Sequence, residues 1–239
     1  MKILALETSA KSVSAAVVEN GAVLASAYQN MGLTHSVTLM PLVDSMLKNA
    51  GLTAKDMELI AAAAGPGSFT GLRIGVSAAK GLAWALELPC CGVSTLEAMA
   101  ENARAFEGTV ICAMDARRQQ IYNAVFDCHD GALERRCEDR AVALELLAGE
   151  LKNDKNRKIV VGDGAKLCYN YLLEQGIPCS IAPADELYQK AVGVGLAAER
   201  MAAEGRTVTA QELCPVYLRL SQAERERLAK GLPITLDAK

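Results

Sequence analysis

The chain has 239 residues, 51% of them hydrophobic, so it is long enough for one large or two small domains with a sizeable core. Its net charge of −3 argues against a protein that grips nucleic acid alone, because such proteins present a basic surface to phosphates. The sequence has no run of about 18 apolar residues that could span a membrane, and its first residues lack the pattern expected of a signal peptide. These features predict a cytoplasmic protein whose contact with RNA, if it has one, needs a partner.

The eight cysteines are scattered along the chain without a CxxC pair. Cys90 and Cys91 are adjacent, which suits neither zinc chelation nor a bridge between the two. In a chain of this size without a signal peptide, we expect buried and reduced thiols and no structural zinc site.

The first hundred residues alternate between predicted strands and helices. Residues 3–6 are continuously apolar, as in a strand buried on both faces. Two further strands, 13–18 and 22–27, meet at Asn20-Gly21, a strong hairpin turn, and a helix over 36–50 ends at Gly51. After it we predict a strand at 58–64, a tight loop at 65–69, a helix at 70–86, a strand at 89–93 and a helix at 94–104.

The same order restarts after Gly108. Two successions of strands, helix, strand and helix predict two α/β lobes, 1–108 and 109–239, of which the second is smaller. The charge-rich stretch 221–230 is a candidate helix with a solvated face. In the second lobe we predict strands at 110–114, 120–126, 133–137 and 159–161, and helices at 141–152, 165–175 and 186–204.

The end of the first strand is the first candidate site. Glu7, Thr8 and Ser9 stand where an acid and hydroxyls can hold a metal-bound nucleotide phosphate. In such a site, backbone amides of the turn bind the phosphate and the acid binds a water molecule of the cation. The turn over 10–12 has no glycine, however, which hinders close approach of the backbone. The alternative is a turn whose hydroxyls satisfy their own backbone, and both interpretations stay open.

The second candidate is a glycine-rich loop, GPGSFTGLR over residues 65–73, which contains Gly65, Gly67 and Ser68. A loop between a strand and a helix N-terminus can bind an anion. It is not a P-loop, because Leu72 stands where that motif needs lysine. A tight turn that leads into the helix is the alternative.

Several stretches together resemble the TsaB (YeaZ) family: LETS at 6–9, GPGSFTGLRIG at 65–75, KGLA at 80–83 and PVYLR at 215–219. The resemblance is tight over the first hundred residues and looser between 110 and 200. It implies a two-lobed α/β fold of the actin/Hsc70/sugar-kinase (ASKHA) type with a reduced second lobe. It also implies a non-catalytic partner of the metal-bearing paralogue TsaD and the ATPase TsaE in putting threonylcarbamoyl on tRNA, with tRNA met only through the complex.

The resemblance also indicates what this chain lacks. In the catalytic relatives, two histidines separated by three residues follow the Gly-Val that matches Gly92-Val93, and two imidazoles on one helical face can bind one metal. Here Thr95 and Met99 occupy those two positions. Neither a hydroxyl nor a thioether replaces imidazole as a ligand, so no metal site is predicted.

The remaining candidates for chemistry are few. His35 and His129 are the two histidines, and a single histidine at a helix start is typical of a capping or packing residue. Asp115 and Asp163 end predicted strands, where sites of this fold class often lie. No cofactor is predicted, and two other functions stay open: a glycoprotease-like hydrolase or small kinase, and a stand-alone nucleotide-binding regulator.

Two helices are more apolar than surface helices should be. The helix 70–86 has apolar side chains on every side and must be covered all round, and the helix 36–50 carries two adjacent apolar stripes. Either the second lobe or a neighbouring helix covers them, or, as the resemblance implies, they form a bundle with matching helices of a TsaD-type partner. A homodimer would use the same patch when that partner is absent. The predicted interface comprises Leu39, Met40, Val43, Met46, Leu47, Gly71, Gly75, Ala78, Ala79 and Leu82.

Overall fold

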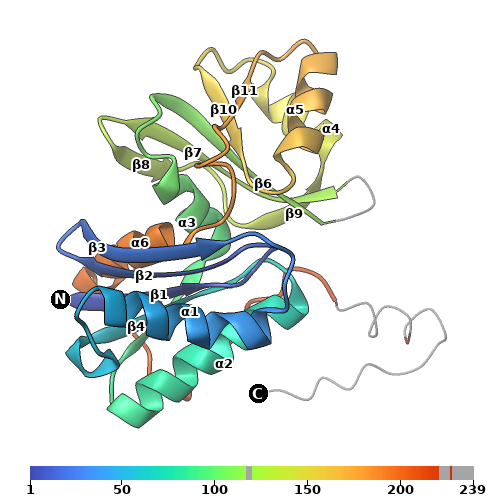
Figure 1. The fold of residues 1–239 in the computed structure, drawn as a ribbon. Helices are drawn as coiled ribbons and strands as arrows, with labels where there is room; N and C mark the ends of the chain where they lie inside the picture. The colour runs from blue at the N-terminus through green and yellow to red at the C-terminus, as the bar shows by residue number, and fades with distance from the viewer. Residues whose placement is uncertain (117–119, 221–226, 228–239) are drawn as a thin grey trace.

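A computed structural model describes residues 1–116, 120–220 and 227 of the chain. Two β-sheets, each with helices packed on it, form two lobes that meet along the middle of the molecule (Figure 1). Within the described ranges, no helix is long and apolar enough to cross a membrane.

The first sheet has five strands in the order β3-β2-β1-β4-β5. β1 pairs antiparallel with β2 and parallel with β4, so the prediction that residues 1–28 and 58–64 share one sheet is confirmed. The side chains of β1 alternate between two separate cores, Leu4 and Leu6 in one and Ile3 and Ala5 in the other, which is why the strand is apolar throughout. The strands are Lys2–Glu7 (β1), Val13–Glu19 (β2), Ala22–Gln29 (β3), Leu59–Gly65 (β4) and Cys90–Ser94 (β5).

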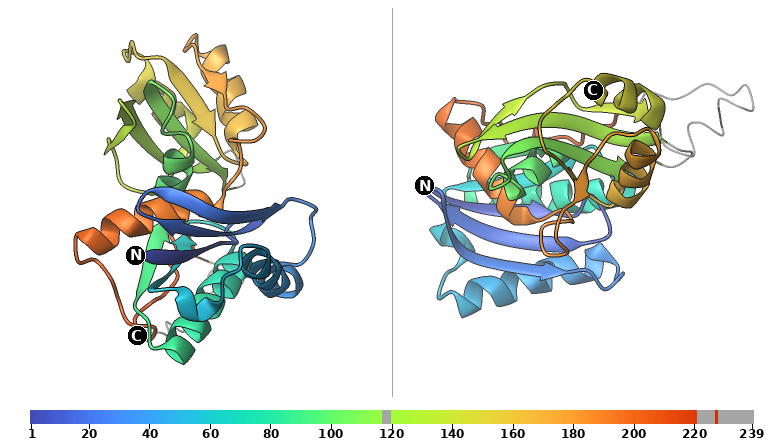
Figure 2. Two further views of the ribbon diagram at one scale, coloured as in Figure 1. Left: turned by 60° about the vertical axis from the view of Figure 1, so that its left-hand side comes forward. Right: turned by 90° about the horizontal axis from the view of Figure 1, so that it is seen from above.

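Helices α1 (His35–Asn49) and α2 (Phe69–Leu86) cover the face of this sheet that lies away from the second lobe (Figures 1 and 2). Ser68 caps the N-terminus of α2, because its hydroxyl accepts a hydrogen bond from the amide of Gly71 at 3.3 Å. A short 3₁₀ turn, Ala54–Asp56, leads from α1 to β4.

The second sheet repeats the topology of the first. Its order is β11-β10-β6-β7-β8, with β9 pairing with β7. β6 stands in the place of β1, antiparallel to one neighbour and parallel to the other, although no repeat is visible in the sequence. The strands are Gly108–Asp115 (β6), Gln120–His129 (β7), Ala132–Arg135 (β8), Arg140–Ala143 (β9), Lys158–Val161 (β10) and Ser180–Ile181 (β11), and the helices packed on them are Leu144–Leu151 (α4) and Ala165–Glu174 (α5).

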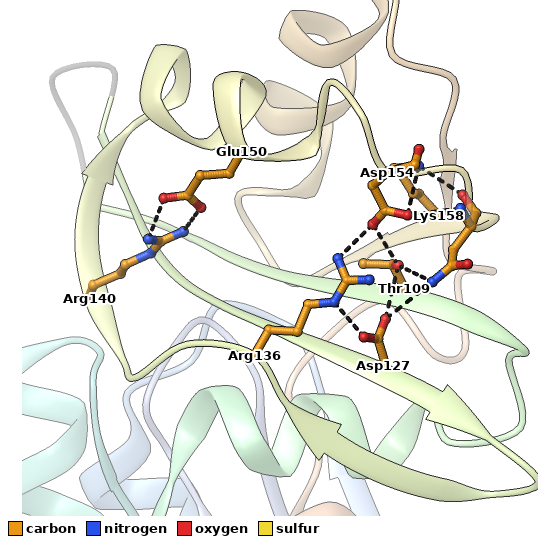
Figure 3. A network of polar contacts seen from close by, with 8 residues as sticks. Thr109, Asp127, Arg136, Arg140, Glu150, Asp154 and Lys158 are labelled. Carbon is orange, nitrogen blue, oxygen red and sulfur yellow. Dashed lines mark hydrogen bonds and ion pairs between the residues drawn. The ribbon is translucent and has the colours of Figure 1, made fainter.

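A polar network joins the strands β6, β7 and β10 at one end of the second sheet (Figure 3). Arg136 donates to Asp127 at 2.5 Å and to Asp154 at 2.6 Å. The hydroxyl of Thr109 on β6 lies 3.2 Å from a carboxylate oxygen of Asp127 and 3.0 Å from one of Asp154 and can donate to either. The ammonium group of Lys158 donates to the backbone carbonyl of Asp154 at 2.6 Å. Lys158 is 4% exposed, so these bonds satisfy a buried charge.

The last helix of each lobe lies between the two sheets. Ala98 of α3 (Thr95–Asn102) packs with the first sheet, whereas Leu96 and Met99 of the same helix pack on the second. α6 (Ala191–Ala203), which follows the second sheet, packs through residues such as Val194 onto the first. Within the range 109–239 that was assigned to the second lobe, α6 therefore packs on the first sheet instead.

Two predicted helices also need correction. The helix predicted over 186–204 starts only at Ala191, and the helix predicted over 141–152 starts at Leu144, because the residues before it pair with β7 as strand β9. β11 was not predicted, since two residues carry no periodic signal. Five of the eight cysteines are buried and all are free thiols, but Cys214 is exposed. The predicted helix 221–230 lies outside the described residues apart from Arg227.

Candidate functional site

The turn after β1 lies at the junction of the two lobes. Glu7 is fully buried, and its Oε1 accepts the amide of Ser9 at 2.5 Å. Burial raises the pKa of Glu7 to about 7, although hydrogen bonding from Ser9 opposes the rise, and the charge of Asp163 adds to it. Within the described chain, Oε2 of Glu7 and Oγ of Ser9 have no hydrogen-bond partner.

The glycine-rich loop packs directly on this turn. A Cβ at Gly67 would lie 2.5 Å from the carbonyl oxygen of Ser9, and one at Gly71 would lie 2.1 Å from that of Thr8. The amide of Ser68 donates to the Ser9 carbonyl at 2.7 Å, and the Thr8 hydroxyl donates to the Gly71 carbonyl at 2.7 Å. The glycines thus allow two backbones to touch, and the donors named here are engaged inside the protein. This geometry favours the tight-turn interpretation over an open anion site.

The segment 207–220, which we call the strap, runs along β5 and α2 to the second lobe. Val208 pairs with Cys90 at the edge of β5. The ammonium group of Lys80 donates to the carbonyls of Gln211 and Leu213, each at 3.0 Å. The strap therefore covers the sheet edge and binds the middle of α2.

The end of the strap joins the glycine-rich loop to the second lobe. The rings of Tyr217 and Phe69 stack with centroids 4.2 Å apart, and Arg73 donates to the Tyr217 hydroxyl at 3.0 Å. Arg219 then donates to the carbonyl of Ala116, at the end of the second sheet, at 2.6 Å. The PVYLR stretch and the arginine of GLRIG thus meet in space. Their motifs were recognised in the sequence, but no role was assigned to these side chains.

The second lobe contributes acids to the junction. Burial raises the pKa of Asp163, and its Oδ1 accepts a hydrogen bond from the buried amide of Gln189 at 3.1 Å. A cleft of about 530 Å³ lies between the lobes, with Asp115, Asp163 and Ser9 on its walls together with Lys11 and Arg219. Sequence analysis missed Gln189, because it lies in a segment that was predicted to be helical.

The two histidines take no part in this cleft. The Nε2 atom of His35 lies 2.7 Å from the carbonyl oxygen of Ala10, so the ring ties the start of α1 to the turn after β1. His129 is largely exposed and lies 3.7 Å from Glu107. His35 is thus a packing residue, as predicted.

Thr95 and Met99, at the two positions where the resemblance implies histidine ligands, belong to the core. Thr95 is 0% and Met99 2% exposed. The methyl group of Met99 lies 2.4 Å from where a Cβ on Gly162 would be, so this side chain fills the space between α3 and the end of β10.

Most of the predicted partner interface is instead the core of the first lobe. The helical ridge of small residues in α2 does not face outward, because a Cβ at Gly75 would lie 2.3 Å from the hydroxyl of Thr8. Only Met40, at 41% exposure, and the half-buried Ala78 and Leu82 remain accessible. The predicted interface residues that the chain buries itself are Leu39, Val43, Met46, Leu47, Gly71, Gly75 and Ala79.

Comparison with known proteins agrees with this architecture. The family model "TsaD: tRNA N6-adenosine threonylcarbamoyltransferase" matches residues 29–226. The chain is 34% identical to the tRNA threonylcarbamoyladenosine biosynthesis protein TsaB of Bacillus subtilis (strain 168), over 94% of this chain and 96% of the relative. It is 33% identical to TsaB of Escherichia coli (strain K12), over 92% and 95% of the two chains.

A solved structure titled "YeaZ from Pseudomonas aeruginosa" superposes with a TM-score of 0.77 at 29% identity, covering 91% of this chain and 99% of that one. The likeness extends over both lobes, which confirms the predicted two-lobed α/β fold. By sequence over nearly its full length and by fold, the chain belongs to the TsaB family of tRNA threonylcarbamoyladenosine biosynthesis proteins.

Proposed function

We propose that this chain is a non-catalytic subunit required for threonylcarbamoyl transfer to the adenosine next to the anticodon of tRNA. In this proposal it is the scaffold and activator of a metal-bearing TsaD-type paralogue and works with a TsaE-type ATPase, and tRNA is met only through the complex. The names of its relatives support the pathway. One observation carries the non-catalytic role: Thr95 and Met99 are packed into the core, in the place where the resemblance puts metal ligands.

The partner surface that we propose is the exposed side of the α1–α2 pair. Ser77 and Gly81 are exposed on α2, next to the half-buried Ala78 and Leu82. Such small side chains let a second helix backbone approach closely. Met40 of α1 and Trp84 of α2, 77% exposed, provide apolar area at this surface.

Reconstitution from purified components tests the catalytic part of the proposal. With tRNA, a threonylcarbamoyl donor and the TsaD-type and TsaE-type proteins, modified adenosine should form only when this chain is added. This chain alone should form none. Modification by the chain alone, or an undiminished rate without it, would refute the proposal.

A charge on α2 tests the partner surface. Ser77→Glu should weaken binding to the TsaD-type protein at least tenfold, because a carboxylate pressed into a helix interface loses its water without gaining a partner. Asn170→Glu on α5, the helix in the corresponding place of the second lobe, is the matched control and should bind normally. Equal binding by both variants would exclude this surface. Calorimetric titration with ATP and Mg²⁺ separately tests the nucleotide-binding regulator.

A further inference from the structure

The single tryptophan of the chain lies on the surface. Trp84, near the C-terminal end of α2, is 77% exposed, although tryptophan is a side chain that folding usually buries to a large extent. No stacked ring, cation–π contact or hydrogen bond of its indole occurs among the residues that the structure describes. A tryptophan that the fold leaves exposed in this way is typical of binding surfaces, where this residue is enriched.

A hollow of about 750 Å³ lies beside this ring, between the end of α2 and the start of the strap. A space of this size is within the range of sites that bind ligands, and such sites are mostly apolar with a few polar groups. The apolar part of the wall consists of Ala83, Trp84, Leu88, Pro89, Val208 and Ala210. The hollow can therefore hold more than one side chain of a bound segment.

The charge at this hollow has one sign. Among the described residues that line it, Glu87 and Glu212 are acidic and none is basic, and both carboxylates belong to exposed residues. Oε2 of Glu212 accepts the amide of Thr209 at 2.9 Å and its hydroxyl at 2.8 Å, and these hydrogen bonds lower the pKa of Glu212. Glu212 is therefore a fixed negative charge at neutral pH, on the side of the hollow that the strap forms.

Glu87, on the side that α2 forms, does not stabilise the helix end that it occupies. It is the C-cap residue of α2, and its negative charge lies at the negative end of the helix dipole, where a cation would be favourable. Within the described chain its carboxylate has no partner. The adjoining basic side chains bind elsewhere, Lys80 to two carbonyls of the strap and Arg206 to Glu204. The carboxylate of Glu87 is thus free to bind a cation from outside.

We propose that this hollow binds an arginine side chain that a partner protein presents on a short apolar segment. The guanidinium group lies against the ring of Trp84 and donates to Glu87, because arginine stacks on aromatic rings and its planar set of donors fits a carboxylate. The apolar wall contacts the side chains that flank the arginine. Charge selects a protein segment over nucleic acid here, because two carboxylates repel phosphate.

Because the chain has one tryptophan, the indole N–H resonance of Trp84 in an NMR spectrum reports directly on this hollow. The probe is the peptide acetyl-Leu-Arg-Leu-amide, and its matched control carries citrulline, which has nearly the shape of arginine but no charge. The arginine peptide should shift the Trp84 resonance to saturation, and the citrulline peptide should bind at least tenfold more weakly. Raising the salt concentration from about 20 mM to about 300 mM should weaken the arginine peptide severalfold, because the charges are exposed.

Variants assign the selectivity to Glu87. Glu87→Gln should weaken the arginine peptide at least fivefold and leave the citrulline peptide unchanged. Glu87→Gly is a second variant, which suits the left-handed backbone at this position (φ 57°), and a thermal melt of each confirms that the fold is intact. Glu174→Gln on α5 is the matched control for a lost carboxylate and should bind the arginine peptide as the native chain does.

Ser77→Glu should also bind the peptide normally, since Ser77 does not line the hollow, so this site and the surface for the TsaD-type protein can fail separately. An arginine peptide that leaves the Trp84 resonance unmoved, equal binding of the two peptides, or native affinity in Glu87→Gln would each overturn the proposal. A single-stranded oligoribonucleotide that shifts the resonance at lower concentration than the arginine peptide would overturn it as well.

Discussion

Glu7 makes the stability of this protein depend on pH. Its pKa is about 7 in the fold, mainly through burial, against an ordinary value of 4.5. Between these values the folded protein keeps a proton that the unfolded chain has released, so folding is most favoured below pH 4.5. This contribution to the free energy of unfolding is lost as the pH rises through about 7. For a pKa shift of this size it amounts to about 3 kcal/mol.

Replacing Glu7 by glutamine should remove this dependence, because the amide has the same shape, can still accept the Ser9 amide and does not ionise. In urea unfolding, Glu7→Gln should gain about 2–3 kcal/mol relative to the native chain between pH 5 and pH 8. Glu174→Gln, at an exposed position on α5, is the control and should show no such trend. If the free energies of unfolding of Glu7→Gln and the native protein differ by the same amount at pH 5 and pH 8, Glu7 is ionised at both.

The glycines of α2 differ in what surrounds them, which the sequence cannot reveal. Gly71 has the Thr8 carbonyl oxygen 2.1 Å from the place of a Cβ, whereas Gly81 has nothing within 4 Å. Gly71→Ala should therefore destabilise the fold by about 1–3 kcal/mol through the displacement of backbone. Gly81→Ala should stabilise it by roughly 0.5–1 kcal/mol, because alanine is the better helix former. Denaturant unfolding of the pair measures both, and equal effects would show that the helix does not pack on the turn after β1.

Helices and strands with a clear hydrophobic pattern in the sequence were predictable, and features that depend on residues distant in the sequence were not. β1 reads as a strand buried on both faces, and α1 and α2 were placed to within a residue or two of their ends. That α2 is apolar all round was also correct, but the pattern could not say what covers each side. The strap and the turn after β1 cover parts of it, so the predicted interface contains residues such as Ala79 that are 0% exposed.

The candidate site was predicted only in part, for a similar reason. The sequence located Glu7 and the glycine-rich loop at strand ends, and the structure brings them together. The sequence could not indicate that the two segments would form hydrogen bonds with each other. One such bond joins the Ser68 amide to the Ser9 carbonyl at 2.7 Å. Tyr217 approaches Phe69 and Arg73 from more than 100 residues away along the chain, and no spacing rule covers contacts of that range.

The two lobes are joined by an ionic cluster as well as by the helices between them. Glu97 of α3 accepts hydrogen bonds from Arg135 of the second sheet at 3.2 Å and from Arg200 of α6 at 2.5 Å. Arg200 also bonds to Glu101, which is nearly buried. Glu97 is thus the one carboxylate in this cluster that binds an arginine from β8 and an arginine from α6, and the helix that carries it touches both cores.

Glu97→Ala should therefore affect the molecule as a whole. Two partly buried guanidinium groups would lose a charged acceptor, which should cost about 1.5–3 kcal/mol and weaken the coupling between the lobes. In differential scanning calorimetry, the van't Hoff enthalpy should fall below the calorimetric enthalpy, because the lobes then begin to unfold separately. Lys48→Ala breaks an exposed pair with Asp44 within α1 and should change stability by no more than about 0.5 kcal/mol. If Glu97→Ala unfolds in a single transition with equal enthalpies, the packing of α3 and α6 alone makes the two lobes one cooperative unit.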